Sequence, residues 1–139
     1  MNQVTTGAYW AQSILKATHS DVEFNLCKEA LDRLDRASAA RKTGDRESCH
    51  EELKGTVSIL IELADCLEYN EHGSLALRLD SLYNSMIQAL QPSGGEIDDE
   101  ALEVCRNVLG NWVEAWRQVK LQERRTSNVQ RRTPIYAAG

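Results

Sequence analysis

The chain has 139 residues, of which 42% are hydrophobic and 27% are charged, and its formal net charge is −5. This length fits one domain, the composition excludes a chain that is disordered throughout, and no run approaches the roughly 18 apolar residues that a membrane-spanning helix needs. The first six residues have neither the basic nor the apolar region of a signal peptide, so we expect a cytoplasmic protein without membrane insertion.

Charge is unevenly distributed along the chain. Residues 1–116 contain 10 basic and 20 acidic residues, whereas residues 117–139 contain six basic residues and one acidic residue. Binding to nucleic acid phosphates requires a positive surface, so the acidic body argues against nucleic acid as the partner. We interpret residues 1–120 as a single domain and residues 121–139 as a basic, disordered tail.

Hydrophobic residues recur every three or four positions in almost every segment between turn-forming residues, which predicts helices. Ser20 and Glu23 form a capping box, Gly44 ends the helix that follows, and Ser74 caps another helix after a break over residues 70–74. The expected helices cover about residues 4–17, 21–42, 46–69, 74–91 and 97–120. No segment alternates like a strand. We therefore predict an all-α fold, an antiparallel up-down four-helix bundle with the short N-terminal helical segment packed across it.

The helix expected over residues 46–69 carries more apolar surface than one core requires. Its apolar side chains cover an arc of about 220°, whereas a face packed on one core covers little more than about 100°. One side of the arc contains Val57, Leu60, Ile61, Ala64 and Leu67, and the arc is extended by Ile59, Leu63 and Cys66. Either this helix is covered on nearly all sides, or Ile59, Leu63 and Cys66 line an exposed groove for an amphipathic partner. Leu77, on the polar side of the next helix, is a further exposed apolar residue.

Residues that could support enzyme chemistry or metal binding are sparse. The four cysteines, which we expect to be buried and reduced, form no Cys-x-x-Cys pair and are Cys27, Cys49, Cys66 and Cys105. Glu47 and His50 form one Glu-x-x-His motif, whereas a di-iron bundle needs two such motifs and further glutamates. The sequence contains no phosphate-binding loop, dinucleotide-binding loop or nucleophile elbow. We predict no catalytic residue, no metal site and no cofactor.

Several short motifs follow one another between residues 7 and 117. They are Gly7-Ala8-Tyr9, His19-Ser20-Asp21, Leu26-Cys27-Lys28-Glu29-Ala30-Leu31, Ile59-Leu60-Ile61-Glu62-Leu63, Leu79-Asp80-Ser81-Leu82-Tyr83 and Glu114-Ala115-Trp116. In order and separation they resemble the motifs of flagellar export chaperones of the FliS family. Positions at which this chain departs from the family pattern are Asp21 in place of a proline, Cys27 in place of a tyrosine, and Glu29 and Ser74 in place of glycines.

The resemblance implies a small cytoplasmic helical bundle without catalysis or cofactor. Such chaperones bind the C-terminal segment of newly made flagellin, prevent its premature polymerisation and help to present it to the flagellar type III export apparatus. An export-gate component or another flagellar regulator is a further expected partner. The alternative function is a helical adaptor for a different flagellar or secretion component.

The resemblance also implies that the N-terminal segment takes part in binding, through Tyr9 with Trp10 and Ile14 beside it. The alternative for these three residues is that they only dock a short helix on the bundle. The full set of expected partner contacts is Tyr9, Trp10, Ile14, Ile59, Leu63, Cys66 and Leu77.

Overall fold

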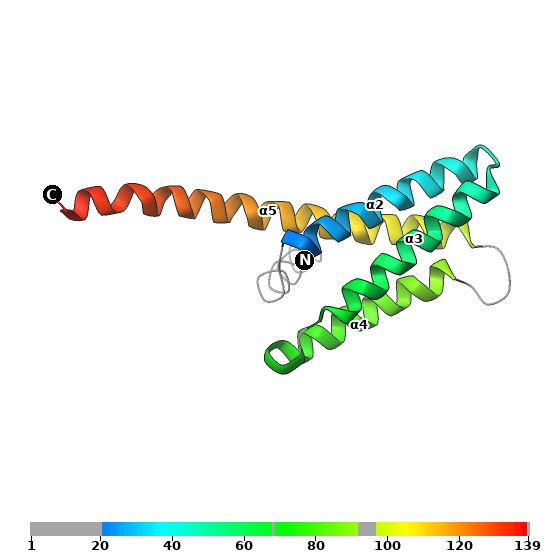
Figure 1. Cartoon of the computed structure of the whole chain (residues 1–139), viewed down its shortest axis with the longest axis horizontal. Helices are drawn as coiled ribbons and strands as arrows, with labels where there is room; N and C mark the ends of the chain where they lie inside the picture. Colours follow the sequence, from blue (N-terminus) through cyan, green and yellow to red (C-terminus); the bar gives the residue numbers. More distant parts are fainter. Residues whose placement is uncertain (1–20, 68, 92–96, 139) are drawn as a thin grey trace, which may run out of the picture.

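A computed structural model describes residues 21–67, 69–91 and 97–138, and these residues form four α-helices and no strand (Figure 1). The helices are α2 (Asp21–Lys42), α3 (Arg46–Asp65), α4 (Tyr69–Leu90) and α5 (Asp99–Ala138). Helix α2 contacts α3 and α5, and α4 also contacts α3 and α5, with the α4–α5 contact much the smallest. The prediction of an all-α four-helix bundle is therefore confirmed. The helix expected over residues 4–17 lies outside the described residues.

The turn between α2 and α3 forms where the sequence predicts it. Gly44 has a φ of 79°, in the left-handed region that glycine adopts without a steric penalty from a Cβ atom. The Asp45 side chain accepts a hydrogen bond of 3.1 Å from the backbone N–H of Ser48 and so caps α3. Because the connection is so short, α2 and α3 lie side by side in opposite directions.

The boundary between α3 and α4 differs from the sequence-based prediction. Helix α3 ends at Asp65 and α4 begins at Tyr69, so the predicted break over residues 70–74 is wrong. The N–H of Cys66 closes the last turn of α3 by donating to the carbonyl oxygens three and four residues before it, both at 3.2 Å. Gly73 lies inside α4, because an interior glycine costs a helix only about 1 kcal/mol, less than the burial of one large apolar side chain provides.

Helix α5 is longer than predicted. Its 40 residues run to Ala138, so the predicted end near Lys120 is wrong. The residues that follow, Leu121-Gln122-Glu123-Arg124-Arg125, are all strong helix formers, which allows the helix to continue. In Figure 1 the C-terminal part of α5 extends beyond the other described helices. The division into a domain over residues 1–120 and a basic tail over residues 121–139 stays a prediction.

The core lies between the four helices and takes large side chains from each of them. Leu34 of α2, Leu60 of α3, Leu79 of α4 and Trp116 of α5 are among its largest fully buried members. Phe24 of α2 stacks on Trp116, with the ring centroids 5.5 Å apart. Because one core joins all four helices, the surface that each helix leaves uncovered is fixed by how its neighbours pack.

Candidate functional site

Two of the residues predicted to line an exposed groove on α3 belong to the core. Ile59 and Leu63 are buried, with 7% and 3% of their surface exposed, so the prediction of an open groove at these residues is wrong. Cys66, directly after α3, is exposed. Ile61, which the helical pattern assigns to the core side, is 47% exposed. The wide apolar arc is thus uncovered at its two edges, Ile61 and Cys66, and buried between them at Ile59 and Leu63.

The packing of α2 against α3 explains why Ile59 is buried. Glu52 accepts hydrogen bonds from Arg33 at 3.1 Å and from Arg36 at 2.7 Å, so this side of α3 faces α2. Gly55 lies against α2 as well, since a Cβ atom there would collide with the Arg33 side chain. Ile59 follows Gly55 by one helical turn and therefore points the same way. Helix α3 needs its wide arc because it packs against both α2 and α4.

The remaining predicted contacts fall into two groups. Leu77 is 60% exposed, as expected from its position on the polar side of α4, and it remains available to a partner. Tyr9, Trp10 and Ile14 lie outside the described residues. Of the four predicted contacts that the structure describes, Cys66 and Leu77 are exposed, and Ile59 and Leu63 are buried.

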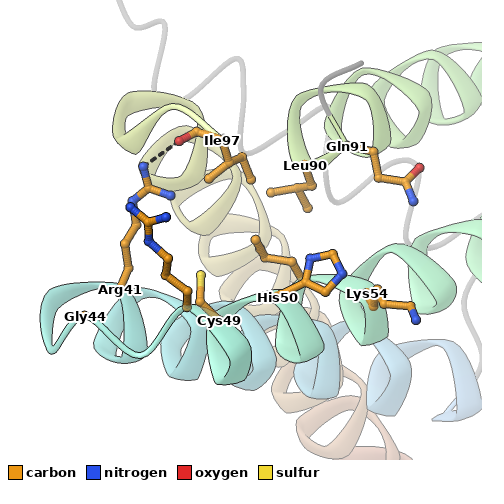
Figure 2. A pocket seen from close by; sticks show the side chains of 10 residues that line it. Arg41, Gly44, Cys49, His50, Lys54, Leu90, Gln91 and Ile97 are labelled. Atoms are coloured by element: carbon orange, nitrogen blue, oxygen red, sulfur yellow. Dashed lines mark hydrogen bonds between the residues drawn. The ribbon is translucent and has the colours of Figure 1, made fainter. Parts of the chain in front are cut away.

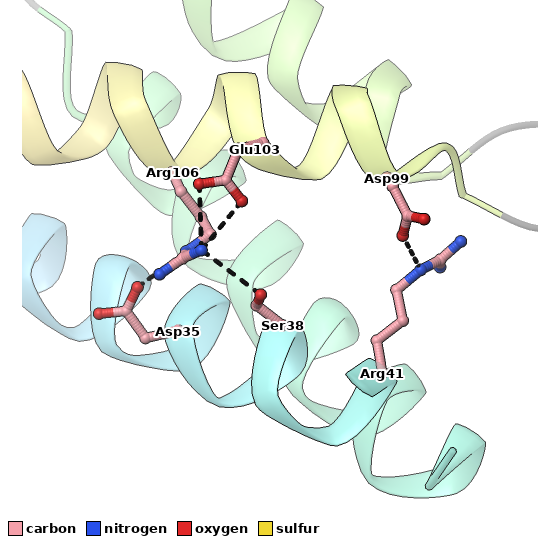
Figure 3. A network of polar contacts seen from close by, with 6 residues as sticks. All are labelled: Asp35, Ser38, Arg41, Asp99, Glu103 and Arg106. Carbon is pink, nitrogen blue, oxygen red and sulfur yellow. Dashed lines mark hydrogen bonds and ion pairs between the residues drawn. The ribbon is translucent and has the colours of Figure 1, made fainter. Parts of the chain in front are cut away.

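Arginine contacts fix the orientation of α5 against α2 (Figure 3). Arg106 of α5 donates from Nε to Asp35 at 2.9 Å and from Nη1 to Ser38 Oγ at 3.4 Å. Arg41, near the end of α2, forms an ion pair with Asp99 at the start of α5. Exposed ion pairs contribute little stability, about 0–1 kcal/mol each. They do establish which side of α5 faces α2.

The side of α5 directed away from α2 carries an apolar strip that we call the α5 flank, made up of Ala101, Val104, Val108 and Ala115. At about 100° per residue, Val108 and Val104 lie about 160° and 200° around the helix from Arg106. Val104 is 53% exposed, and the other three side chains are half-buried. Because α4 makes only a small contact with α5, this strip is partly open along several turns.

A pocket of about 620 Å³ lies at one end of the bundle (Figure 2). Its walls come from the end of α2, the first turns of α3, the end of α4 and Ile97, which lies two residues before α5. Leu53, Leu90 and Ile97 provide an apolar floor, and Arg41 closes one side by donating to the backbone carbonyl of Ile97 at 2.5 Å. The sequence analysis did not single out this pocket, because its residues come from four segments that only the fold brings together.

Three of the four cysteines are buried and act as small packing residues of the core. All four are free thiols, but Cys66 is exposed, so the expectation that all four are buried is wrong for this one. Burial, with a smaller effect from Glu23, raises the pKa of the Cys27 thiol to about 12, which keeps it protonated and unreactive at neutral pH. Within residues 21–67, 69–91 and 97–138, no three His, Cys, Asp or Glu side chains are grouped so that they could hold a metal ion.

Comparison with known proteins establishes the family. The family model described as "Flagellar protein FliS" matches residues 1–123. The chain belongs to the FliS family. The resemblance inferred from the sequence motifs is thereby confirmed.

Two curated relatives of this FliS-family chain are both named "Flagellar secretion chaperone FliS". The one from Campylobacter jejuni is 34% identical over 88 residues, which cover 63% of this chain and 69% of the relative. The one from Vibrio cholerae is 29% identical over 87 residues, which cover 60% of this chain and 64% of the relative. The matched region thus spans about two thirds of each relative. No solved structure matches the chain.

The family is one of chaperones and not of enzymes, as predicted. In the part of the chain that the structure describes, no helix has an apolar stretch long enough to cross a membrane.

Proposed function

We propose that this chain is a cytoplasmic export chaperone that binds the C-terminal segment of flagellin, prevents its premature polymerisation and assists its delivery to the flagellar type III export apparatus. The match of the FliS family model to residues 1–123 is the observation that carries this proposal. The names of the two curated relatives, as flagellar secretion chaperones, support it.

The α5 flank is the described surface best suited to such a client. A segment that folds as it binds must recover its ordering cost through apolar burial, so its site has to extend over several helical turns. The flank does so from Ala101 to Ala115, and its most exposed member is Val104. The contact between α4 and α5 is small. An amphipathic client helix packed along α5 would cover the flank that α4 leaves open.

Tyr9, Trp10 and Ile14 of the N-terminal segment, together with the exposed Cys66 and Leu77, remain proposed contacts of the client. Ile59 and Leu63 are excluded from this set because they are core residues.

The proposal is tested by calorimetric titration of the full chain with a flagellin C-terminal peptide. We expect binding at tens of micromolar or tighter, with a negative heat-capacity change from apolar burial. Absence of binding at these concentrations would refute the flagellin client. Capture of a different flagellar or secretion component from a flagellated cell would then favour the adaptor function.

A matched pair of variants tests the position of the site. Val104→Asp introduces a charge into the flank and should weaken peptide binding about tenfold or more, since a desolvated carboxylate cannot be paired there. Leu121→Asp is the control, because Leu121 is also an exposed apolar residue of α5 but lies about 100° or more around the helix from Val104 and Val108. Equal weakening by both variants, or none by Val104→Asp, would show that the client binds elsewhere.

A further inference from the structure

The C-terminal part of α5 carries exposed basic side chains. Arg124 lies about five helical turns after Arg106 and therefore on the same side of α5, the side that faces α2 within the bundle. Helix α2 begins at Asp21, which forms an ion pair with Lys120, so Arg124 lies beyond the first residue of α2. Arg124 and Arg125 are exposed and form no ion pair in the described part of the chain.

We call this side of α5 the basic face, and its described members are Arg117, Leu121, Arg124 and Arg125. They lie within an arc of about 100° around the helix. The FliS family model ends at residue 123, whereas α5 continues to Ala138. From residue 124 onward the sequence contains four arginines and no Asp or Glu. The basic face thus extends past the part of the chain that matches the family.

The outer side of α3 carries the opposite charge. Its acidic face consists of Glu47, Glu51, Glu62 and Asp65, which lie within an arc of about 60° and along about 27 Å of the helix. All four side chains are exposed, and none forms an ion pair or a hydrogen bond in the described part of the chain. Lys54 lies on the same side of α3, so the carboxylates still outnumber the basic groups.

The two faces are complementary in apolar content as well as in charge. Leu121 of the basic face is 41% exposed, and Ile61, which borders the acidic face, is 47% exposed. Contact between the two faces would therefore cover one large apolar side chain from each helix. The basic face cannot reach α3 of its own molecule, because α5 is one continuous helix whose C-terminal part extends beyond the other described helices (Figure 1).

We propose that two copies of this chain form a dimer in which the basic face of each copy docks on the acidic face of the other. Reciprocal docking buries two identical contacts and closes the assembly at two copies. Charge complementarity fixes which helix of one copy meets which helix of the other.

Two other kinds of occupant fit the basic face less well. A helix that lies on a membrane carries apolar side chains opposite its basic ones, whereas Gln122 and Thr126 lie about 160° and 200° around α5 from Arg124. Nucleic acid would meet a body in which residues 1–116 contain twice as many acidic as basic residues.

Sedimentation equilibrium of the full chain tests the dimer. We expect a dissociation constant on the order of 10 µM at about 0.05 M salt, since exposed charge pairs make up much of the contact. Raising the salt to about 0.5 M should weaken the dimer at least about tenfold, because the charges on both faces are open to screening.

Charge reversal locates the contact. The double variant Arg124→Glu with Arg125→Glu, and separately the double variant Glu51→Lys with Glu62→Lys, should each weaken the dimer at least about tenfold. Far-UV circular dichroism checks that the helices are retained. Arg78→Glu reverses an exposed arginine of α4, outside both faces, and should change the affinity less than about twofold.

Mixing the two double variants is the decisive experiment. Each one alone brings like charges together at both contacts, whereas a mixed pair brings opposite charges together at both. The mixture should therefore dimerise about as well as the parent chain, although neither component does so alone.

Several results would overturn the proposal. These are a monomer at about 200 µM and about 0.05 M salt, a dimer that reversal of either face leaves intact, a mixture of the double variants that stays monomeric, and an open-ended polymer. Co-sedimentation with vesicles of anionic lipid, lost in the variant with Arg124→Glu and Arg125→Glu, would make a membrane the occupant of the basic face if the chain alone is monomeric. Val108 of the α5 flank lies about 160° around the helix from Arg124, so a monomeric chain that still binds the flagellin peptide would refute the dimer and leave the proposed chaperone function intact.

Discussion

Replacing Ile59 with alanine should destabilise the protein much more than the same change two residues later at Ile61. The helical pattern alone suggests the opposite, because it assigns Ile61 to the core and Ile59 to the outer edge of the arc. Ile59 is 7% exposed, so its loss removes three buried carbons, worth about 2–2.5 kcal/mol in transfer free energy. The cavity left against α2 raises the expected cost to about 3–4 kcal/mol. Ile61 is 47% exposed and leaves no closed cavity, so its loss should cost about 1 kcal/mol.

Urea unfolding followed by far-UV circular dichroism measures both costs. With a slope of about 2 kcal/mol per M, the midpoint should fall by about 1.5–2 M for Ile59→Ala and by about 0.5 M for Ile61→Ala. Unchanged slopes would show that the variants differ from the parent in stability alone. Equal shifts, or a larger shift for Ile61→Ala, would refute the packing of α3 between α2 and α4 and restore the groove predicted from the sequence.

Two further predictions concern acid stability and glycine conformation. A hydrogen bond from Arg36 holds the pKa of Glu52 below its ordinary value, so the stability linked to this carboxylate is present above its unfolded-state pKa and is lost as the pH falls through the folded-state pKa. Glu52→Gln should therefore lose less stability than the parent between pH 6 and pH 3, measured by urea midpoints at each pH; an unchanged loss would show that the ion pair is not coupled to folding. Gly44→Ala should cost about 1 kcal/mol, because alanine is strained at a φ of 79°. Gly110→Ala, inside α5 where an added Cβ atom would meet no neighbouring side chain within 4 Å, should instead stabilise the helix by up to about 1 kcal/mol. Thermal unfolding of the two glycine variants should give midpoint shifts of opposite sign, and shifts of the same sign would contradict this explanation.

The helical character of the chain and the position of the α2–α3 turn could be predicted from the sequence, because both depend on interactions between residues a few positions apart. Gly44 and Asp45 specify a left-handed residue and a helix cap within a few positions, independently of the rest of the fold. The limits of local signals are visible at Gly73, where a glycine predicted a break and the structure continues α4. At Lys120 the fading apolar pattern likewise predicted a helix end, although helix propensity carries α5 further.

The candidate site was much less predictable. The sequence correctly identified an apolar arc on α3 that is too wide for one contact, and it left open whether a partner or the protein itself covers it. The structure decides this for Ile59, which packs on the side of α3 that faces α2. It also exposes Val104, a residue that the helical pattern did not single out. A helical wheel gives the angle between two side chains, but it contains no information about the direction from which a neighbouring helix approaches.

The amino-acid sequence by itself determined an all-α chain, its FliS-family motifs and the position of the α2–α3 turn, since each depends on the order and spacing of nearby residues. Only the tertiary structure decided which apolar side chains are covered and which basic residues share a pocket. Burial and charge clustering depend on contacts between helices that are far apart along the chain. Such contacts place Lys54 and Gln91 in the wall of one pocket and Arg41 beside Ile97, and no local pattern encodes them.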